Sequence, residues 1–255
     1  MKAVILAGGF GTRISEETHR IPKPMVEIGG KPILWHIMKM YENHGVTDFV
    51  VCLGYKGYAI KEFFLNYAMH NSDVSVQTRS QGVTFHSSAT EDWNVTLVDT
   101  GPDSMTGGRL RRIRPWVDST FFATYGDGVS DVDITAALAQ HRQKGQLATM
   151  TTVTPPGRYG AVNEDESGNV TSFSEKPPGD GANINGGFFV LEPEVLDLIE
   201  GDSTIFEEET LPQLAKMRQL SAYHHHGFWQ AMDTLREKNQ LEKLWDSGKA
   251  AWRSW

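Results

Sequence analysis

The sequence has few of the features that mark secreted or membrane-spanning proteins. It contains one cysteine, Cys52, so no disulfide can form within the chain. No run is long and apolar enough to span a bilayer. The N-terminal "MKAVILAGG" continues into further glycines rather than a cleavage-site pattern, which predicts a strand instead of a signal peptide. From these features we expect a cytoplasmic protein.

Basic residues are also scarce. The 24 lysines and arginines are outnumbered by 32 acidic residues, and the formal net charge is −8. This balance argues against a general nucleic-acid-binding protein, which usually carries a basic surface. A small nucleotide site is not excluded, since it needs only a few well-placed cations. The length of 255 residues and the 39% hydrophobic content are those of a globular protein with room for a sizeable core.

The first part of the chain alternates between two apolar patterns. "KAVILA" (2–7) and "DFVVCLG" (48–54) are continuous apolar runs, typical of strands buried on both faces of a parallel sheet. Residues 31–45 and 58–70 have apolar side chains at helical spacing. This alternation predicts an α/β fold, a Rossmann-like mixed and mostly parallel sheet flanked by helices.

The rest of the chain predicts further strands and helices, and in one region the pattern of apolar and polar residues changes. Short strands with polar alternation between about 71 and 100, including "WNVTLVDTG", predict a small antiparallel excursion from the main sheet. Further elements are expected as helices at 107–117, 133–145, 208–219 and 235–248, strands at 120–131, 146–157, 182–193 and 220–234, and a hairpin at 160–177. No repeat or linker is present, so we expect a single domain over residues 1–255.

The loop after the first strand, "AGGFGTR", predicts a phosphate-binding site. Ligands of open parallel sheets lie beyond the carboxyl ends of the strands. Glycines at 8, 9 and 11 allow backbone N–H groups to approach a phosphate closely. Thr12 adds a hydroxyl, and the guanidinium of Arg13 can bind two phosphate oxygens. The loop matches neither the Walker A pattern nor the dinucleotide fingerprint, and a tight glycine turn without a ligand stays open as an alternative.

Lys23 lies between Pro22 and Pro24, which restrict the backbone on both sides. A lysine on stiff backbone loses less conformational entropy when it binds an anion, so Lys23 is a candidate ligand for a phosphate. The alternative is a surface lysine in a polyproline-like turn.

Taken together, "LAGGFGTRI…PKPMVEIGGKPIL" resembles the signature of the sugar-1-phosphate nucleotidylyltransferases. Further matches follow in order along the chain, namely "GDG" (126–128), "PPGRYGAV" (155–162), "SEKP" (174–177), "NGGFFVL" (185–191) and "FWQAMDT" (228–234). "DTGPDSMTGGRLRRI" and "GFWQAMDTLREK" are similar to the cytidylyltransferase branch of that family. Each motif alone is weak evidence, but the ordered set covers essentially the full length.

The resemblance implies an enzyme that joins CTP and α-D-glucose 1-phosphate into CDP-glucose and expels pyrophosphate, with Mg²⁺ as cofactor. Such a product would feed deoxysugar synthesis for a cell-surface polysaccharide such as the O-antigen of lipopolysaccharide. The family also implies a homo-oligomer, of which a hexamer is one form, and no nucleic-acid or membrane partner. Two alternatives stay open: a uridylyl- or thymidylyltransferase, and a non-catalytic nucleotide-sugar-binding subunit.

The resemblance also implies roles for individual residues, with the nucleotide mainly in the N-terminal half and the sugar phosphate mainly in the C-terminal half. The nucleotide would contact Leu6, Ala7, Gly8, Gly9, Gly11, Thr12, Arg13, Lys23, Thr106, Gly107, Gly108, Arg109, Gly126 and Asp127. The sugar phosphate would contact Gly160, Glu175, Lys176 and Asn185. Asp127 and Asp233 would hold Mg²⁺, a hard cation that carboxylates suit. The catalytic set would be Arg13, Lys23, Asp127, Lys176 and Asp233.

The resemblance makes two of these assignments more specific. Arg109 would reach the base or its phosphates, and Lys176 would fix the incoming sugar phosphate. The C-terminal "WDSGKAAWRSW" holds three tryptophans, and such side chains usually pack on a neighbouring surface. We therefore expect this tail to contribute to a subunit interface.

Overall fold

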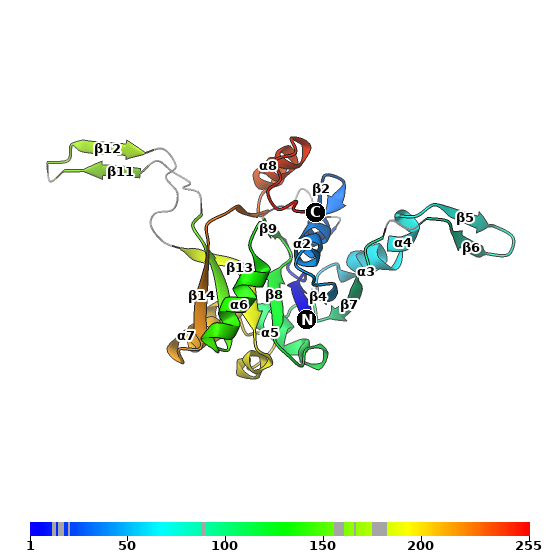
Figure 1. Ribbon diagram of the computed structural model, residues 1–255, viewed down its shortest axis with the longest axis horizontal. Helices are drawn as coiled ribbons and strands as arrows, with labels where there is room; N and C mark the ends of the chain where they lie inside the picture. The colour runs from blue at the N-terminus through cyan, green and yellow to red at the C-terminus, as the bar shows by residue number, and fades with distance from the viewer. Residues whose placement is uncertain are drawn as a thin grey trace.

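The central element of the fold is a mixed sheet of seven strands (Figure 1). The computed structural model describes the chain except residues 12–13, 15–17, 20, 88–89, 156–160, 166 and 175–182. In spatial order the strands are β14 (Leu220–His225), β10 (Ala148–Val153), β13 (Ile184–Leu191), β8 (Phe121–Tyr125), β1 (Lys2–Leu6), β4 (Asp48–Leu53) and β7 (Asn94–Asp99). All neighbouring pairs are parallel except the two that β13 forms with β10 and β8. The predicted mixed, mostly parallel sheet is confirmed.

Two hydrophobic clusters cover the two faces of the sheet. One cluster includes side chains of α2 (Ile33–Glu42), α6 (Ile134–Lys144) and α8 (Leu235–Asp246). The other includes side chains of α5 (Thr106–Arg112), α7 (Leu211–Lys216) and a 3₁₀ turn at Pro193–Leu198. Cys52 lies in the second cluster, fully buried, as its apolar surroundings in the sequence predict. The sheet is therefore covered on both sides, as a parallel sheet requires.

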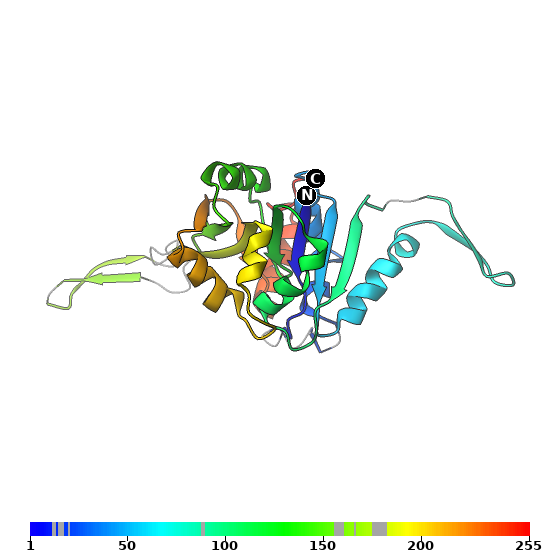
Figure 2. The same cartoon turned by 90° about the horizontal axis from the view of Figure 1, so that it is seen from below.

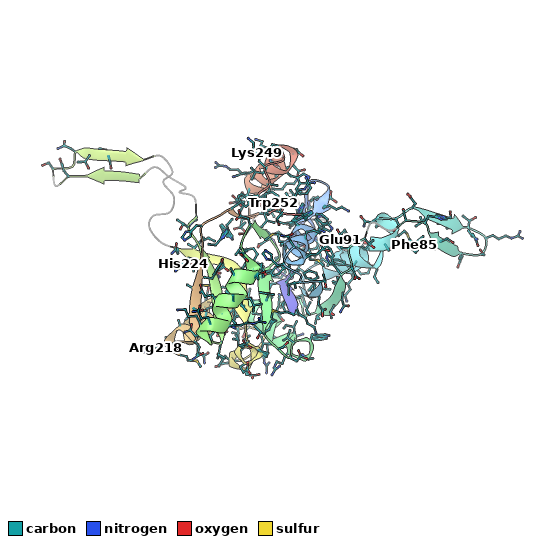
Figure 3. The ribbon with its side chains drawn as sticks, in the orientation of Figure 1. Phe85, Glu91, Arg218, His224, Lys249 and Trp252 are labelled. Atoms are coloured by element: carbon teal, nitrogen blue, oxygen red, sulfur yellow. The ribbon has the colours of Figure 1, made fainter. Side chains whose placement is uncertain are left out.

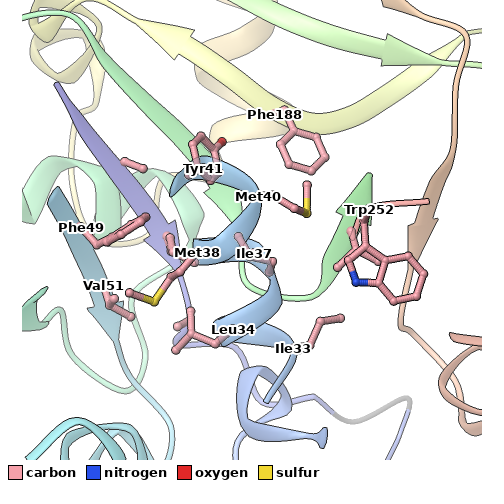
Figure 4. Packing of buried hydrophobic residues seen from close by; sticks show 14 of the residues in the cluster. Ile33, Leu34, Ile37, Met38, Met40, Tyr41, Phe49, Val51, Phe188 and Trp252 are labelled. Atoms are coloured by element: carbon pink, nitrogen blue, oxygen red, sulfur yellow. The ribbon is translucent and has the colours of Figure 1, made fainter. Parts of the chain in front are cut away.

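Helix α2 forms the centre of the first cluster. Its apolar side chains recur at helical spacing, and Leu34, Ile37, Met38 and Tyr41 are fully buried. Figure 4 shows them on α2, with Phe49 of the sheet on one side of the helix and Trp252 on the other. Burying a large apolar side chain of this kind contributes about 1.5–3 kcal/mol. This packing fixes the helix that follows the Lys23 segment, which contains a 3₁₀ turn (Lys23–Met25) and the short strands β2 (Glu27–Ile28) and β3 (Lys31–Pro32).

Two β-hairpins extend from the body in opposite directions (Figures 1 and 2). One is β5 (Val74–Gln77) and β6 (Gly82–Phe85), which follow α3 (Gly57–Leu65) and α4 (Tyr67–His70). The other is β11 (Ala161–Glu164) and β12 (Val170–Ser174), within the hairpin expected at 160–177. Figure 3 shows Phe85 on the first hairpin, away from the body, and 49% of its surface is exposed.

The antiparallel excursion is shorter than the sequence predicted. The stretch "WNVTLVDTG" was expected to be antiparallel, but β7 pairs in parallel with β4, with Asp48 opposite Asn94. The expectation was wrong because α3, α4 and the first hairpin form a crossover that returns the chain to the starting edge before β7 begins. Among the described residues of this region, only β5 and β6 are antiparallel.

Several predicted elements are divided in the structure. The strand expected at 120–131 is β8 and β9 (Gly128–Ser130), and the one expected at 220–234 is β14 and β15 (Trp229–Ala231). The helix expected at 107–117 ends at Arg112 and continues as a 3₁₀ turn (Arg114–Trp116), because Pro115 has no N–H to extend it. The helix expected at 208–219 starts with a π-helical turn (Phe206–Thr210) before α7.

The C-terminal tryptophans pack mostly on their own chain, so the expectation of a subunit interface was wrong for Trp252. Trp252 is 1% exposed, and its ring stacks on Phe228 with the centroids 5.5 Å apart. Trp245, Trp252 and Trp255 surround His36 of α2. The tail therefore completes the core beside α2. No helix in the described parts of the chain has the length and apolar character needed to cross a membrane.

Candidate active site

The predicted site residues converge on one edge of the central sheet. β1 and β8 are parallel, with Leu6 opposite Tyr125, so the glycine loop and Gly126 follow neighbouring strand ends. β13 is antiparallel to β8 and therefore begins at this same edge, where Asn185 lies. The carboxyl ends of parallel strands are the usual ligand-binding edge of such sheets.

The glycine loop is shaped by close packing against Arg109. The Gly8 carbonyl accepts hydrogen bonds from the Tyr55 N–H at 3.1 Å and from Arg109 Nη2 at 3.0 Å. A Cβ atom on Gly8 would lie 2.3 Å from Arg109 Nη1, so no larger residue fits without a shift. Gly11 has a φ of +63°, a conformation that glycine adopts at least cost, and its carbonyl accepts a hydrogen bond from Thr18.

Lys23 lies between two aspartates. Its Nζ is 2.6 Å from Asp127 Oδ2 and 2.7 Å from Asp233 Oδ1, and the residue is only 8% exposed. Burial alone would lower the pKa of Lys23, but the two carboxylates outweigh it and the pKa is raised above its ordinary value. The lysine is therefore held as a buried cation. The sequence predicted Lys23 as a ligand for a phosphate, but it did not predict the ion pairs with the two aspartates.

The local fold explains how two distant aspartates meet. β9 pairs with β15, with Gly128 opposite Ala231, and the Met232 N–H donates to the Asp127 carbonyl at 2.8 Å. Asp233 then follows directly, and its N–H donates to Glu237 Oε2 in the first turn of α8. Thr234 and Glu237 form a capping box there. The antiparallel β9–β15 pair on one side and a capped helix on the other thus fix Asp233 opposite Asp127.

Two adjacent cavities meet at these aspartates. The first, of about 420 Å³, is lined by the glycine loop, Lys23, residues 103–106, Arg109 and Gly126. The second, of about 320 Å³, is lined by Asn185, Gly187, Glu207, Trp229 and their neighbours. Tyr125, Asp127 and Asp233 line both. The site therefore has room for two ligands whose reacting ends would meet at the Lys23–Asp127–Asp233 cluster.

Of the base-binding segment predicted at 106–109, Thr106 and Arg109 line the first cavity, whereas Gly107 and Gly108 do not. Most polar groups of the segment have protein partners. The guanidinium of Arg109 donates hydrogen bonds to five acceptors, the Thr100 hydroxyl and the carbonyls of Gly8, Leu53, Gly101 and Pro102. The N–H groups of Gly107 and Gly108 donate to the Thr204 carbonyl. The structure thus gives Arg109 a role in positioning the glycine loop, and its contact with a nucleotide stays a prediction.

Some residues of the cavities were missed from the sequence. Ser104, Phe10, Tyr125, Glu207 and Trp229 line one or both cavities. Tyr125 could have been found, because it directly precedes Gly126 and Asp127 at a strand end. Glu207 carried no signal, since it lies in the acidic run "FEEET", which is typical of a solvated helix face. Burial and the neighbouring Glu207 carboxylate raise the pKa of Tyr125.

Some of the predicted residues cannot be placed. Thr12, Arg13, Gly160, Glu175 and Lys176 lie outside the described residues. Leu6, Ala7, Gly8, Gly9, Gly11, Lys23, Thr106, Arg109, Gly126 and Asp127 all line the first cavity, as their predicted nucleotide contact requires. Asn185 lines the second, which agrees with its assignment to the other substrate.

The residues at the junction of the cavities fit a divalent cation. Across the described positions there is no group of three or more histidine, cysteine, aspartate or glutamate side chains that could hold a metal. However, Asp127 and Asp233 direct one oxygen each at a single cation, the Lys23 ammonium. Two carboxylates completed by water and phosphate oxygens are a usual donor set for Mg²⁺. The ammonium thus marks a point where a cation is stabilised.

Comparison with known proteins shows the family of this chain. The family model described as nucleotidyl transferase matches residues 2–237. The chain belongs to the nucleotidyl transferase family. It is 59% identical to glucose-1-phosphate cytidylyltransferase of Salmonella typhi over 257 aligned residues, covering 100% of both chains, and a protein of the same name from Salmonella typhimurium gives the same values. Both relatives of this nucleotidyl transferase therefore align with it from end to end.

A solved structure shows the same nucleotidyl transferase fold. HddC from Yersinia pseudotuberculosis superposes with a TM-score of 0.69 at 23% identity, covering 96% of this chain and 99% of the other. At that identity the likeness concerns the fold alone. It agrees with the mixed sheet.

Proposed function

We propose that the chain is an enzyme that transfers a cytidylyl group from CTP to α-D-glucose 1-phosphate, giving CDP-glucose and pyrophosphate. The observation that carries the proposal is the buried Lys23–Asp127–Asp233 cluster at the junction of two cavities. Two anionic substrates need such a meeting point. The 59% identity over both full lengths to an enzyme named for this reaction supports the choice of substrates.

The chemical difficulty of the reaction is electrostatic. A phosphate oxygen of the sugar phosphate attacks the α-phosphorus of CTP, the new P–O bond forms, and the bond to the β-phosphate oxygen breaks in line with it. Negative charge increases on the attacking, equatorial and leaving oxygens. No covalent protein nucleophile is needed, so the chain contributes positioning and positive charge.

The two cavities give the substrates separate places. The triphosphate would lie along the glycine loop in the first cavity, where the backbone of Gly8, Gly9 and Gly11 can approach phosphate oxygens. The sugar would lie in the second cavity beside Asn185. Lys23 is held at the boundary, where the two phosphates would meet. We assign Arg13 and Lys176 to the same phosphates by family resemblance.

We assign the cofactor Mg²⁺ to Asp127 and Asp233. When bound, the ion would neutralise charge on the phosphate oxygens. The two carboxylates hold the Lys23 ammonium, and a carboxylate that holds one cation at this point has the geometry to hold another. Lys23 would then be available to the phosphates, on a backbone that the flanking prolines keep stiff.

The preference for CTP rests on the relatives and on the segment "SMTGGR". Hydroxyl and backbone groups can present either polarity to a base, so residue types alone do not distinguish cytosine from uracil.

The proposed substrate pair favours a cytoplasmic enzyme, because nucleoside triphosphates are available in the cytoplasm.

We also infer that the enzyme is a homo-oligomer, with a hexamer as the form that family resemblance favours. The projecting hairpin β5–β6 supports an assembly. Its residues Val76, Val83 and Phe85 are 57%, 43% and 49% exposed. Exposed apolar side chains gathered on one extension are typical of interaction surfaces. Sedimentation of the purified chain would give the number of subunits.

Product identification tests the proposed reaction. The purified enzyme is mixed with CTP, glucose 1-phosphate and Mg²⁺, and the products are followed by ³¹P NMR. We expect the paired resonances of a sugar-linked diphosphate to appear together with pyrophosphate, and a chelator to stop both. Binding of CDP-glucose without turnover of CTP would instead support the non-catalytic subunit.

A further inference from the structure

We propose that Glu207 is a specificity-determining residue of the sugar pocket, and that its carboxylate accepts a hydrogen bond from a ring hydroxyl of the sugar. The inference rests on the proposed function, because it takes the second cavity as the place of the sugar. Glu207 lines that cavity, although it comes from a part of the chain far from every motif that predicted the site.

The position of Glu207 is fixed by its backbone. It is the second residue of a π-helical turn (Phe206–Thr210), a rare conformation that occurs often at functional sites. Phe206, just before it, is 1% exposed and packs on Phe189 with ring centroids 5.6 Å apart. The Phe206 N–H also donates to the Thr106 hydroxyl at 3.0 Å. The turn is therefore anchored at its first residue, which aims the next side chain at the cavity.

The carboxylate of Glu207 is oriented by two hydroxyl groups. Thr106 Oγ1 donates to Oε2 at 2.5 Å, and the Tyr125 hydroxyl donates to Oε1. Asn185 Nδ2 donates in turn to the Tyr125 hydroxyl at 3.3 Å. Thr106 and Tyr125 line the first cavity, and Tyr125, Asn185 and Glu207 line the second. The acid thus lies within a short hydrogen-bonded chain between the cavities, with Tyr125 on one side of it and Thr106 on the other.

The carboxylate keeps acceptor capacity beyond these two hydrogen bonds. Each of its oxygens can accept two hydrogen bonds, and among the described residues Thr106 supplies one donor to Oε2 and Tyr125 supplies one to Oε1. No ion pair joins Glu207 to a lysine, arginine or histidine within the described parts of the chain. A ligand group beside it must therefore be a hydrogen-bond donor and not an anion, since a phosphate would be repelled. A sugar hydroxyl meets that condition.

This arrangement also sets the direction of the sugar. Asp127 and Asp233 lie at the junction of the cavities, where the phosphate would be neutralised by cations, while Glu207 and Asn185 line the second cavity. The hydroxylated ring would therefore face Glu207, with its phosphate toward Lys23. A sugar without the matching hydroxyl would leave one acceptor position of this half-buried carboxylate unfilled, and sites built to bind a substrate hydroxyl reject analogues that lack it.

The test compares glucose 1-phosphate with its monodeoxy analogues in wild type and in Glu207→Ala. We expect the wild type to discriminate against one analogue by about 10- to 100-fold in kcat/KM, the range of a hydrogen bond to a charged group. In Glu207→Ala that discrimination should disappear, with the other analogues unaffected and the KM for CTP changed less than about threefold. Glu208→Gln, an exposed neighbour on the same turn, is the matched control and should behave as wild type.

The possible results separate the inference from the proposed function. If Glu207→Ala keeps the full wild-type discrimination, or if it changes the ratio of CTP to UTP use instead, the role of Glu207 is wrong while the reaction stands. If the wild type forms no CDP-glucose, the proposed function itself fails. Should Glu207→Ala not fold by circular dichroism, Glu207→Gln is used. It keeps the shape and loses the charge, and we expect it to lose several-fold of the same discrimination.

Discussion

Lys23 and His36 are two buried basic side chains on one stretch of the chain, and the fold shifts their pKa values in opposite directions. Lys23 is 8% exposed and faces two carboxylates, which raise its pKa and keep it charged. His36 is fully buried among tryptophans, and burial lowers its pKa to about 4, so it is neutral at ordinary pH.

The hydrogen bonds of His36 agree with a neutral ring. Its Nε2 lies 2.8 Å from the Ile28 carbonyl, which requires an N–H there, and Trp252 Nε1 donates to its Nδ1 at 3.3 Å. A second ring proton would oppose the tryptophan N–H. The comparison shows that burial does not decide the charge of a basic group alone, because facing carboxylates can outweigh it. A basic group keeps its charge where carboxylates face it, at the edge where anionic substrates would bind, and loses it where the surroundings only complete the core.

The largest effect is expected where one of the carboxylates that face Lys23 is removed. Asp127→Asn and Asp233→Asn each take one carboxylate from the cluster that faces Lys23. We expect kcat to fall about 10²–10³-fold, the usual loss for one group in an electrostatic site, with the fold retained. Steady-state pyrophosphate release measures it.

Asp197→Asn is the control for these variants, because Asp197 is an exposed partner of Arg114 away from the cavities. It should leave the rate unchanged. An unaltered Mg²⁺-dependent rate in Asp127→Asn or Asp233→Asn would remove that residue from its assigned role.

The next effect concerns His36, the neutral one of the two buried basic side chains. His36 has a pKa lower in the folded chain than in the unfolded chain, so its contribution to stability is complete above about pH 6.5 and is lost as pH falls toward 4. The expected loss is about 3 kcal/mol by pH 4. Urea unfolding at a series of pH values measures the slope. His36→Gln should show a flatter profile, and an identical slope in both proteins would show that His36 is not the responsible group.

Arg109 allows a third case, a buried base with mainly carbonyl partners. Arg109→Met would leave several buried carbonyls without donors, so we expect a loss of about 2 kcal/mol in the free energy of unfolding. Because the Gly8 carbonyl is among them, the KM for the nucleotide should also rise. Denaturant unfolding and initial rates measure the two effects.

Arg112→Met provides the contrast on the same helix, since Arg112 is exposed and pairs with Asp202 on the surface. It should destabilise the fold much less than Arg109→Met, because solvent screens an exposed ion pair. Equal losses in Arg109→Met and Arg112→Met would contradict the distinction between the buried and the exposed arginine.

The smallest effect is expected at the rim of the tryptophan cluster. The guanidinium of Arg253 lies over the Trp245 ring, 4.7 Å from its centroid, and its charge also helps to lower the pKa of His36. Arg253→Ala should therefore cost about 0.5–1 kcal/mol at neutral pH. The acid-induced loss of stability should become slightly smaller. A larger acid-induced loss in this variant would be inconsistent with the assigned charge effect.

The sequence predicted the parts of the site that depend on local chemistry. The glycine loop, the stiff backbone around Lys23 and the acids at 127 and 233 are short patterns with a direct physical meaning, and the structure brings the described ones together. The ion pairs of Lys23 could not be predicted, because they depend on the pairing of β9 with β15. Glu207 depends on a π-helical turn that a repetitive acidic stretch does not reveal.

The fold was predictable to a similar degree. Continuous apolar runs and helical spacing give the parallel sheet and its covering helices. The direction of β7 was missed because polar alternation describes how exposed a strand is, and the direction comes from the crossover before it. The tail was misread because Trp252 has a partner in His36, which lies far from it in the sequence.

One measurement tests the central claim most directly, namely pyrophosphate release by the purified chain with Mg²⁺, glucose 1-phosphate and each of CTP, UTP, dTTP, ATP and GTP in parallel. Release with CTP alone, abolished by a chelator, is the predicted result. Release with UTP or dTTP in place of CTP would contradict the assigned base. No release with any nucleotide, despite tight binding of one, would contradict the proposal that the chain is an enzyme.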